Sequence, residues 1–104
     1  MIKEHYKLEY LPLFWSDLQE IVLYIRDTLK TPMAAQHFVE EVKQGILNHL
    51  SNPTIAAIYP SIYKREHDYY WFPIGNYMAF YVVIADVMEV RRCVYGKRNL
   101  KNIL

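Results

Sequence analysis

The sequence has few cysteines and no long apolar run, and both features narrow the class of protein. Cys93 is the single cysteine among 104 residues, which excludes an intramolecular disulfide. Its apolar surroundings predict a small buried hydrophobe rather than a catalytic thiol. No stretch approaches the ~18 apolar residues of a membrane span, and residues 1–5 lack the cationic start of a signal peptide. We therefore expect a cytoplasmic protein that does not associate with membranes.

The chain also lacks a strong charge of either sign, since its formal net charge is +1. Residues 1–52 hold five Lys/Arg and seven Asp/Glu, a net −2, whereas residues 53–104 hold seven and four, a net +3. The second half therefore makes the better surface for a nucleic acid or an acidic partner. No cluster of His, Asp and Cys has metal-ligand spacing, so we expect neither a metal site nor a cofactor.

Aromatic residues are abundant, and tyrosine above all. Hydrophobic residues make up 53% of the chain and charged residues 22%, which is typical of one globular domain over residues 1–104. Ten tyrosines are more than a core of this size can hide, because each phenol needs apolar cover and a hydrogen-bond partner. Some of them should therefore face solvent or a partner.

The first half of the chain predicts one strand and two helices. Residues 5–10 alternate polar and apolar, which indicates a strand with Tyr6, Leu8 and Tyr10 on one face. Helical spacing begins at Ser16, where Ser16 and Gln19 fit a capping box. In this helix the apolar side comprises Leu18, Ile21, Val22, Ile25 and Leu29, and the opposite polar side comprises Asp17, Glu20 and Asp27.

A second helix is predicted from Thr31-Pro32 to Asn52-Pro53, with proline in its first turn. Its buried stripe comprises Phe38, Val42, Ile46 and Leu50. Together the two helices should form a hairpin.

Three strands are predicted in the second half. Residues 51–68 lack a sustained period and read as an irregular connection with room for a short strand. Strands follow at 69–72, 77–85 and 87–95, with Gly75-Asn76 as the first turn. The strand at 77–85 is apolar on both faces, so it should be central. The expected class is α+β: an N-terminal strand, a helical hairpin and a three-stranded antiparallel run forming one small sheet.

Several short segments, in this order, resemble the RelE/ParE superfamily of toxins from type II toxin-antitoxin modules. The resemblance covers nearly the whole chain. It rests on Asp17-Leu18-Gln19-Glu20-Ile21, the helix from Pro32 to Phe38, Ile74-Gly75-Asn76-Tyr77 with Phe80-Tyr81, and the terminal Gly96-Lys97-Arg98.

The resemblance implies a growth-inhibiting toxin that is neutralised by a cognate antitoxin, with plasmid stabilization among the family's roles. ParE-like members poison DNA gyrase, and RelE-like members cut messenger RNA on the ribosome. A third alternative is an inert module that still binds an antitoxin but has lost its target. A dimer or a hetero-oligomer with the antitoxin is also implied.

The positions at which RelE-like nucleases place cations are matched only in part. The strand before the hairpin reads Tyr70-Trp71-Phe72-Pro73, and the position of an expected arginine holds Met78. Arg98 matches the arginine of their Gly-Lys-Arg segment. These departures favour the ParE-like alternative.

Candidate site residues fall into three groups. If the chain is a nuclease, the catalytic candidates are Arg98, Tyr95, Arg65 and His67. Candidates for contact with the target or with nucleic acid are Lys64, Arg92, Lys97 and Lys101. Candidates for contact with the antitoxin are Trp15, Trp71, Tyr77, Phe80 and Tyr81.

Overall fold

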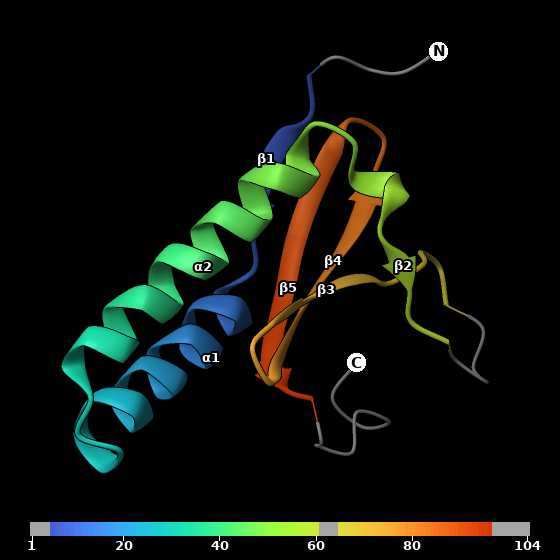
Figure 1. The fold of residues 1–104 in the computed structure, drawn as a ribbon. Helices are drawn as coiled ribbons and strands as arrows, with labels where there is room; N and C mark the ends of the chain where they lie inside the picture. Colours follow the sequence, from blue (N-terminus) through green and yellow to red (C-terminus); the bar gives the residue numbers. More distant parts are fainter. Residues whose placement is uncertain (1–4, 61–64, 97–104) are drawn as a thin grey trace.

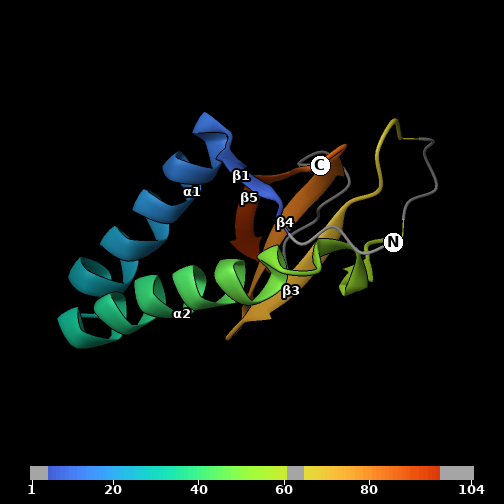
Figure 2. The ribbon, with the colours of Figure 1, turned by 90° about the horizontal axis from the view of Figure 1, so that it is seen from above.

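In the computed structural model, which describes residues 5–60 and 65–96, two helices cover one face of a five-stranded sheet (Figures 1 and 2). The predicted α+β class is confirmed. The elements in chain order are β1 (Lys7–Tyr10), α1 (Pro12–Leu23), the π-helical turn η1 (Tyr24–Thr28), α2 (Pro32–Leu50), the 3-10 turn η2 (Pro53–Ile55), β2 (Ala57–Ile58), β3 (Tyr70–Ile74), β4 (Tyr77–Ile84) and β5 (Val87–Tyr95).

The strands lie in the order β1-β5-β4-β3-β2, so β4 is central, as its apolar faces predict. β1 runs parallel to β5, with Lys7 opposite Val87 and Tyr10 opposite Val90, and all other pairs are antiparallel. A register shift interrupts the β4–β5 pair, because Phe80 faces Arg92 whereas Tyr81 faces Val90. This β-bulge leaves Arg91 as the extra residue on β5.

The first helix begins earlier than its periodicity suggests, and the predicted capping box is wrong. α1 starts at Pro12 after the N-cap Leu11, because the fixed φ of proline suits the first helical position. Ser16 therefore lies inside the helix, where its hydroxyl donates to the carbonyl of Pro12 at 3.4 Å. Asp17 is also not on an exposed polar side, since it is only 7% exposed.

The second helix has the predicted bounds and buried stripe, and one glycine brings it close to the sheet. α2 buries Phe38, Val42 and Ile46 against the sheet. A Cβ on Gly45 would lie 2.4 Å from Cε2 of Phe72 in β3, so only glycine fits at this contact without a shift. Close packing at this point fixes the height of α2 above β3.

The two faces of the sheet are covered differently. The helix-covered face holds the main core, which includes Phe14, Phe72, Tyr81 and Val90. On the opposite face Phe80 and Val94 form a small buried cluster, and the apolar side chains packed against it are Tyr59, Tyr69, Trp71 and Met78. The second face is therefore covered by aromatic side chains of the sheet and its loops rather than by helices.

Candidate functional site

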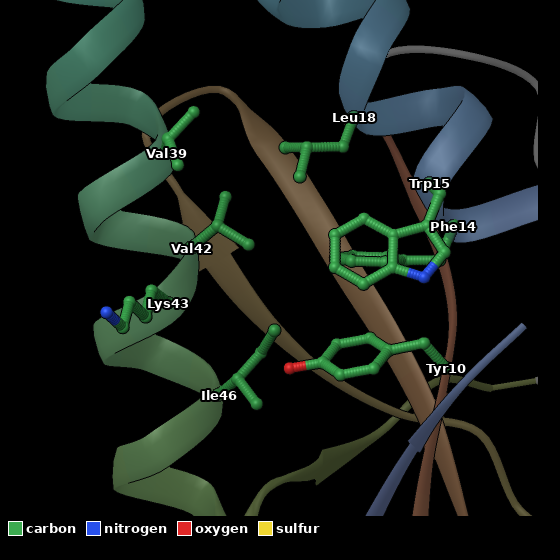
Figure 3. Close-up of a pocket in the computed structure, with 8 residues that line it drawn as sticks. All are labelled: Tyr10, Phe14, Trp15, Leu18, Val39, Val42, Lys43 and Ile46. Atoms are coloured by element: carbon green, nitrogen blue, oxygen red, sulfur yellow. The ribbon is translucent and has the colours of Figure 1, made fainter.

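An apolar groove of about 280 Å³ lies between the two helices (Figure 3). α1 and α2 meet near η1 and diverge toward β1, as both ribbon views show (Figures 1 and 2). β1 lies at the wide end of this gap. The groove is lined by Tyr10 from β1, by Phe14, Trp15 and Leu18 from α1, and by Val39, Val42, Lys43 and Ile46 from α2.

Three aromatic rings form the α1 wall of the groove. The ring centroid of Tyr10 lies 4.8 Å from that of Trp15 and 5.4 Å from that of Phe14, and Phe14 meets Trp15 edge-on at 5.4 Å. Phe14 is buried, whereas Trp15 remains 51% exposed. Burial raises the pKa of Tyr10 above its ordinary value, so this phenol is neutral at physiological pH. The wall is therefore rigid, apolar and accessible.

The α2 wall is aliphatic and carries one charge at its rim. Figure 3 shows Val42 and Ile46 facing the aromatic rings across the gap, with the ammonium group of Lys43 pointing away from the centre. An exposed half of a tryptophan beside aliphatic side chains is the kind of surface that a partner covers at an interface. The arrangement suits a peptide segment with apolar side chains better than a small polar substrate.

A buried ion pair holds α1 against the edge of the sheet. Nε and Nη2 of Arg92 donate to the Asp17 carboxylate at 2.7 and 2.9 Å, and the backbone N–H of Cys93 donates to the same carboxylate at 3.0 Å. β1 pairs with β5 only as far as Val90. Beyond that point, the Asp17 carboxylate accepts the hydrogen bond from the β5 backbone at Cys93. These hydrogen bonds raise the pKa of Arg92. Asp17 thereby positions the helix that supplies Phe14, Trp15 and Leu18.

Arg92, which the sequence predicts as a target contact, has a structural role in this pairing. Its side chain is 18% exposed, and its guanidinium forms a bidentate pair with Asp17. The polar environment at Asp17 could not be read from helical spacing, because its partner lies 75 residues away in the chain.

Two of the predicted antitoxin contacts are corrected by burial. Phe80 and Tyr81 are both 0% exposed, so neither offers surface to a partner. Tyr81 belongs to the main core, where its hydroxyl donates to the carbonyl of Pro53. Phe80 lies under Tyr59 on the opposite face. The two side chains point to opposite faces of β4, and each is fully covered on its own face.

The other predicted antitoxin contacts lie in three different places. Trp15 is in the groove, whereas Trp71 packs against Phe80 and Val94 on the helix-free face. Tyr77 stands at the start of β4, where its ring meets that of Tyr95 edge-on at 5.6 Å. The structure therefore does not bring these residues together on one surface.

The described nuclease candidates, Arg65, His67 and Tyr95, lie in different surroundings. The guanidinium of Arg65 lies 4.7 Å from the ring centroid of Tyr69, and that of Arg91 lies 5.5 Å from the same centroid. Nη1 of Arg91 donates to the Tyr69 hydroxyl at 3.0 Å, and its Nε donates to Glu89 at 2.7 Å. Tyr95, by contrast, contacts Tyr77. Nε2 of His67 lies 3.8 Å from Oε1 of the exposed Glu66.

The remaining cationic candidates, Lys64, Lys97, Arg98 and Lys101, lie outside the described residues. In the described part of the chain, no group of three or more His, Cys, Asp and Glu could hold a metal ion. Over the same residues, no helix is both long and apolar enough to cross a membrane. Cys93 is buried, as predicted, and burial raises its pKa to about 12, so its thiol is protonated and a poor nucleophile.

Sequence reasoning missed most of the groove. Apart from Trp15, none of its lining residues was expected at a binding site. Phe14 and Leu18 have the i, i+4 spacing of one helix face, but an expected start at Ser16 left Phe14 outside the helix. The available signal was Pro12, which marks the true first turn.

Comparison with known proteins identifies the fold and the family. The family model described as "ParE toxin of type II toxin-antitoxin system, parDE" matches residues 8–100. No curated protein matches the chain by sequence.

Solved structures with a similar fold include the chromosomal ParDE toxin-antitoxin system from P. aeruginosa. That match has a TM-score of 0.74 at 14% identity and covers 91% of this chain and 100% of the other. The archaeal RelE-RelB complex from Pyrococcus horikoshii OT3 matches with a TM-score of 0.59 at 14% identity, over 89% and 97% of the two chains. The family model spans nearly the whole chain, and the chain therefore belongs to the ParE toxin family of type II toxin-antitoxin systems.

Proposed function

We propose that this toxin acts on DNA gyrase in the cytoplasm and that the groove between α1 and α2 binds a segment of its cognate antitoxin. Antitoxin binding is supported by the apolar groove with the half-exposed Trp15 on its wall. The solved relative from P. aeruginosa is a ParDE toxin-antitoxin system, which supports an antitoxin as the occupant.

The chemistry of the groove defines the segment that would fit it. The two walls take apolar side chains, and aromatic edges on the α1 wall favour a leucine, methionine or phenylalanine anchor. A carboxylate on the segment could reach Lys43 at the rim, where a solvent-exposed pair adds little affinity but fixes orientation. An amphipathic helix or extended segment with these groups can bury the groove on binding.

The gyrase target is supported by the family and by the separation of the nuclease candidates among the described residues. Cleavage by a 2′-hydroxyl needs a base, an acid and a group that stabilises the developing charge, all held around one phosphate. Arg65 lies in the cluster around Tyr69, and Tyr95 lies in the cluster around Tyr77. This arrangement favours a toxin that binds its target over one that cuts RNA.

A DNA-damage reporter in a bacterial host, read beside growth and the rate of protein synthesis, tests this function. On brief induction we expect growth arrest with a strong reporter signal, and relief when the protein encoded by the adjacent gene is co-expressed. Arrest with early loss of translation and no reporter signal would contradict gyrase as the target and indicate a ribosome-dependent ribonuclease. Soluble expression without arrest would indicate an inert module.

A further inference from the structure

Three tyrosines from three elements line a second cavity, of about 360 Å³. Tyr24 is the first residue of η1, Tyr77 is the first residue of β4 and Tyr95 is the last residue of β5. Tyr77 and Tyr95 are direct partners across the β4–β5 pair, so the sheet register holds their rings together. None of the three lines the groove, and the cavity is therefore a separate site.

Two of the rings are well exposed, and the third is braced from behind. Tyr24 and Tyr95 are 48% and 38% exposed, whereas Tyr77 is only partly accessible. The Tyr77 ring meets Phe38 of α2 edge-on at 5.1 Å and Tyr95 edge-on at 5.6 Å. Packing on both sides fixes the Tyr77 ring, so a ligand would meet a wall that is already formed.

The charge of the cavity favours a cation. Aromatic faces carry negative quadrupole potential and attract a guanidinium or ammonium within about 6 Å of the ring centroid. Over residues 5–60 and 65–96, the side chains that line the cavity are three tyrosines, and none of them carries a charge of its own. Burial and the neighbouring phenols raise the pKa of Tyr77, which keeps it a neutral hydroxyl at physiological pH.

We propose that this cavity binds an arginine side chain of a partner protein. A guanidinium is planar and weakly hydrated, so it can stack on one ring while its N–H groups donate to the phenol oxygens of the others. Lysine offers a compact, strongly hydrated charge that gains less from flat ring faces. The proposal goes beyond the antitoxin groove, because the groove and the cavity share no lining residue.

Titration of the full chain with N-acetyl-arginine methylamide, followed by NMR of the tyrosine rings, tests the proposal. The control ligand is the citrulline analogue, which keeps the shape and most donors but lacks the charge. We expect saturable shifts of Tyr24, Tyr77 and Tyr95, and binding of the citrulline analogue weaker by roughly fivefold or more. Equal binding of both ligands, or no saturable shift with arginine, would overturn the proposal.

Matched variants localise the effect. Tyr95→Leu removes an aromatic face at the end of a strand and should weaken arginine binding by roughly fivefold, whereas Tyr95→Phe keeps the ring face and should weaken binding less. Tyr6→Leu changes a tyrosine outside the cavity and should leave binding unchanged. Thermal melting of each variant shows whether it is folded. Arginine binding that survives unchanged in folded Tyr95→Leu would also overturn the proposal.

Discussion

The two faces of the sheet are built on different physical principles. The helix-covered face excludes water by close packing, with α2 seated on Phe72 through Gly45 and α1 held by the buried pair of Asp17 and Arg92. On the helix-free face, the buried cluster of Phe80 and Val94 is covered mainly by aromatic side chains. There, guanidinium groups on the Tyr69 ring provide the fixed contacts.

This difference explains why the groove occurs where it does. Asp17 holds α1 at the edge of the sheet, while Gly45 holds α2 over β3, so the two helices diverge and leave their facing sides partly uncovered. Rigid attachment at two separate points is what creates a preformed apolar gap. On the helix-free face, by contrast, the aromatic side chains of the described residues pack directly on Phe80 and Val94.

The largest expected effect comes from breaking the attachment of α1. Asp17→Ala leaves the part-buried Arg92 charge and the Cys93 N–H without their acceptor, and should lower the free energy of unfolding by about 3 kcal/mol. Urea denaturation measures this change. Asp27→Ala removes a carboxylate that pairs with Arg26 on the exposed surface, and should change nothing measurable. Similar losses in both variants would refute the special role of Asp17.

A smaller loss is expected where α2 meets the sheet. Gly45→Ala places a methyl group 2.4 Å from the Phe72 ring, and overpacking should cost about 2 kcal/mol despite the better helix propensity of alanine. Gln44→Ala, at an exposed neighbouring position, is the matched control. The double variant Gly45→Ala/Phe72→Leu should be less destabilised than the sum of the two single changes, because the smaller side chain makes room. Strict additivity would contradict the close contact.

The smallest loss is expected on the helix-free face. Arg91→Ala removes the ion pair with Glu89 and the contact with Tyr69, and should cost about 1 kcal/mol, because the guanidinium is partly exposed. Thermal melting gives the value. A loss as large as that of Asp17→Ala would mean that both faces depend equally on buried charge, and the comparison between them would fail.

Local sequence patterns predicted most helices and strands. Features that depend on contacts between distant residues could not be predicted. The second helix could be predicted from Pro32 and its apolar stripe, and the hairpin from Gly75-Asn76, because each depends on neighbours in the chain. The parallel pairing of β1 with β5 could not, since it joins the two ends of the described chain. The same limit hid the role of Asp17. Phe80 and Tyr81 are buried because both faces of β4 are covered by other parts of the chain. The alternation of residues along a strand does not predict this cover.

The most direct test of the account is the affinity of the toxin for the protein encoded by the adjacent gene, measured by calorimetry for two matched variants. Trp15 and Leu13 are both about half exposed on α1, at 51% and 55%, but only Trp15 lines the groove. We predict that Trp15→Ala weakens binding roughly tenfold or more, while Leu13→Ala stays within about twofold of the parent chain. Equal affinities for the two folded variants would contradict the groove as the antitoxin site.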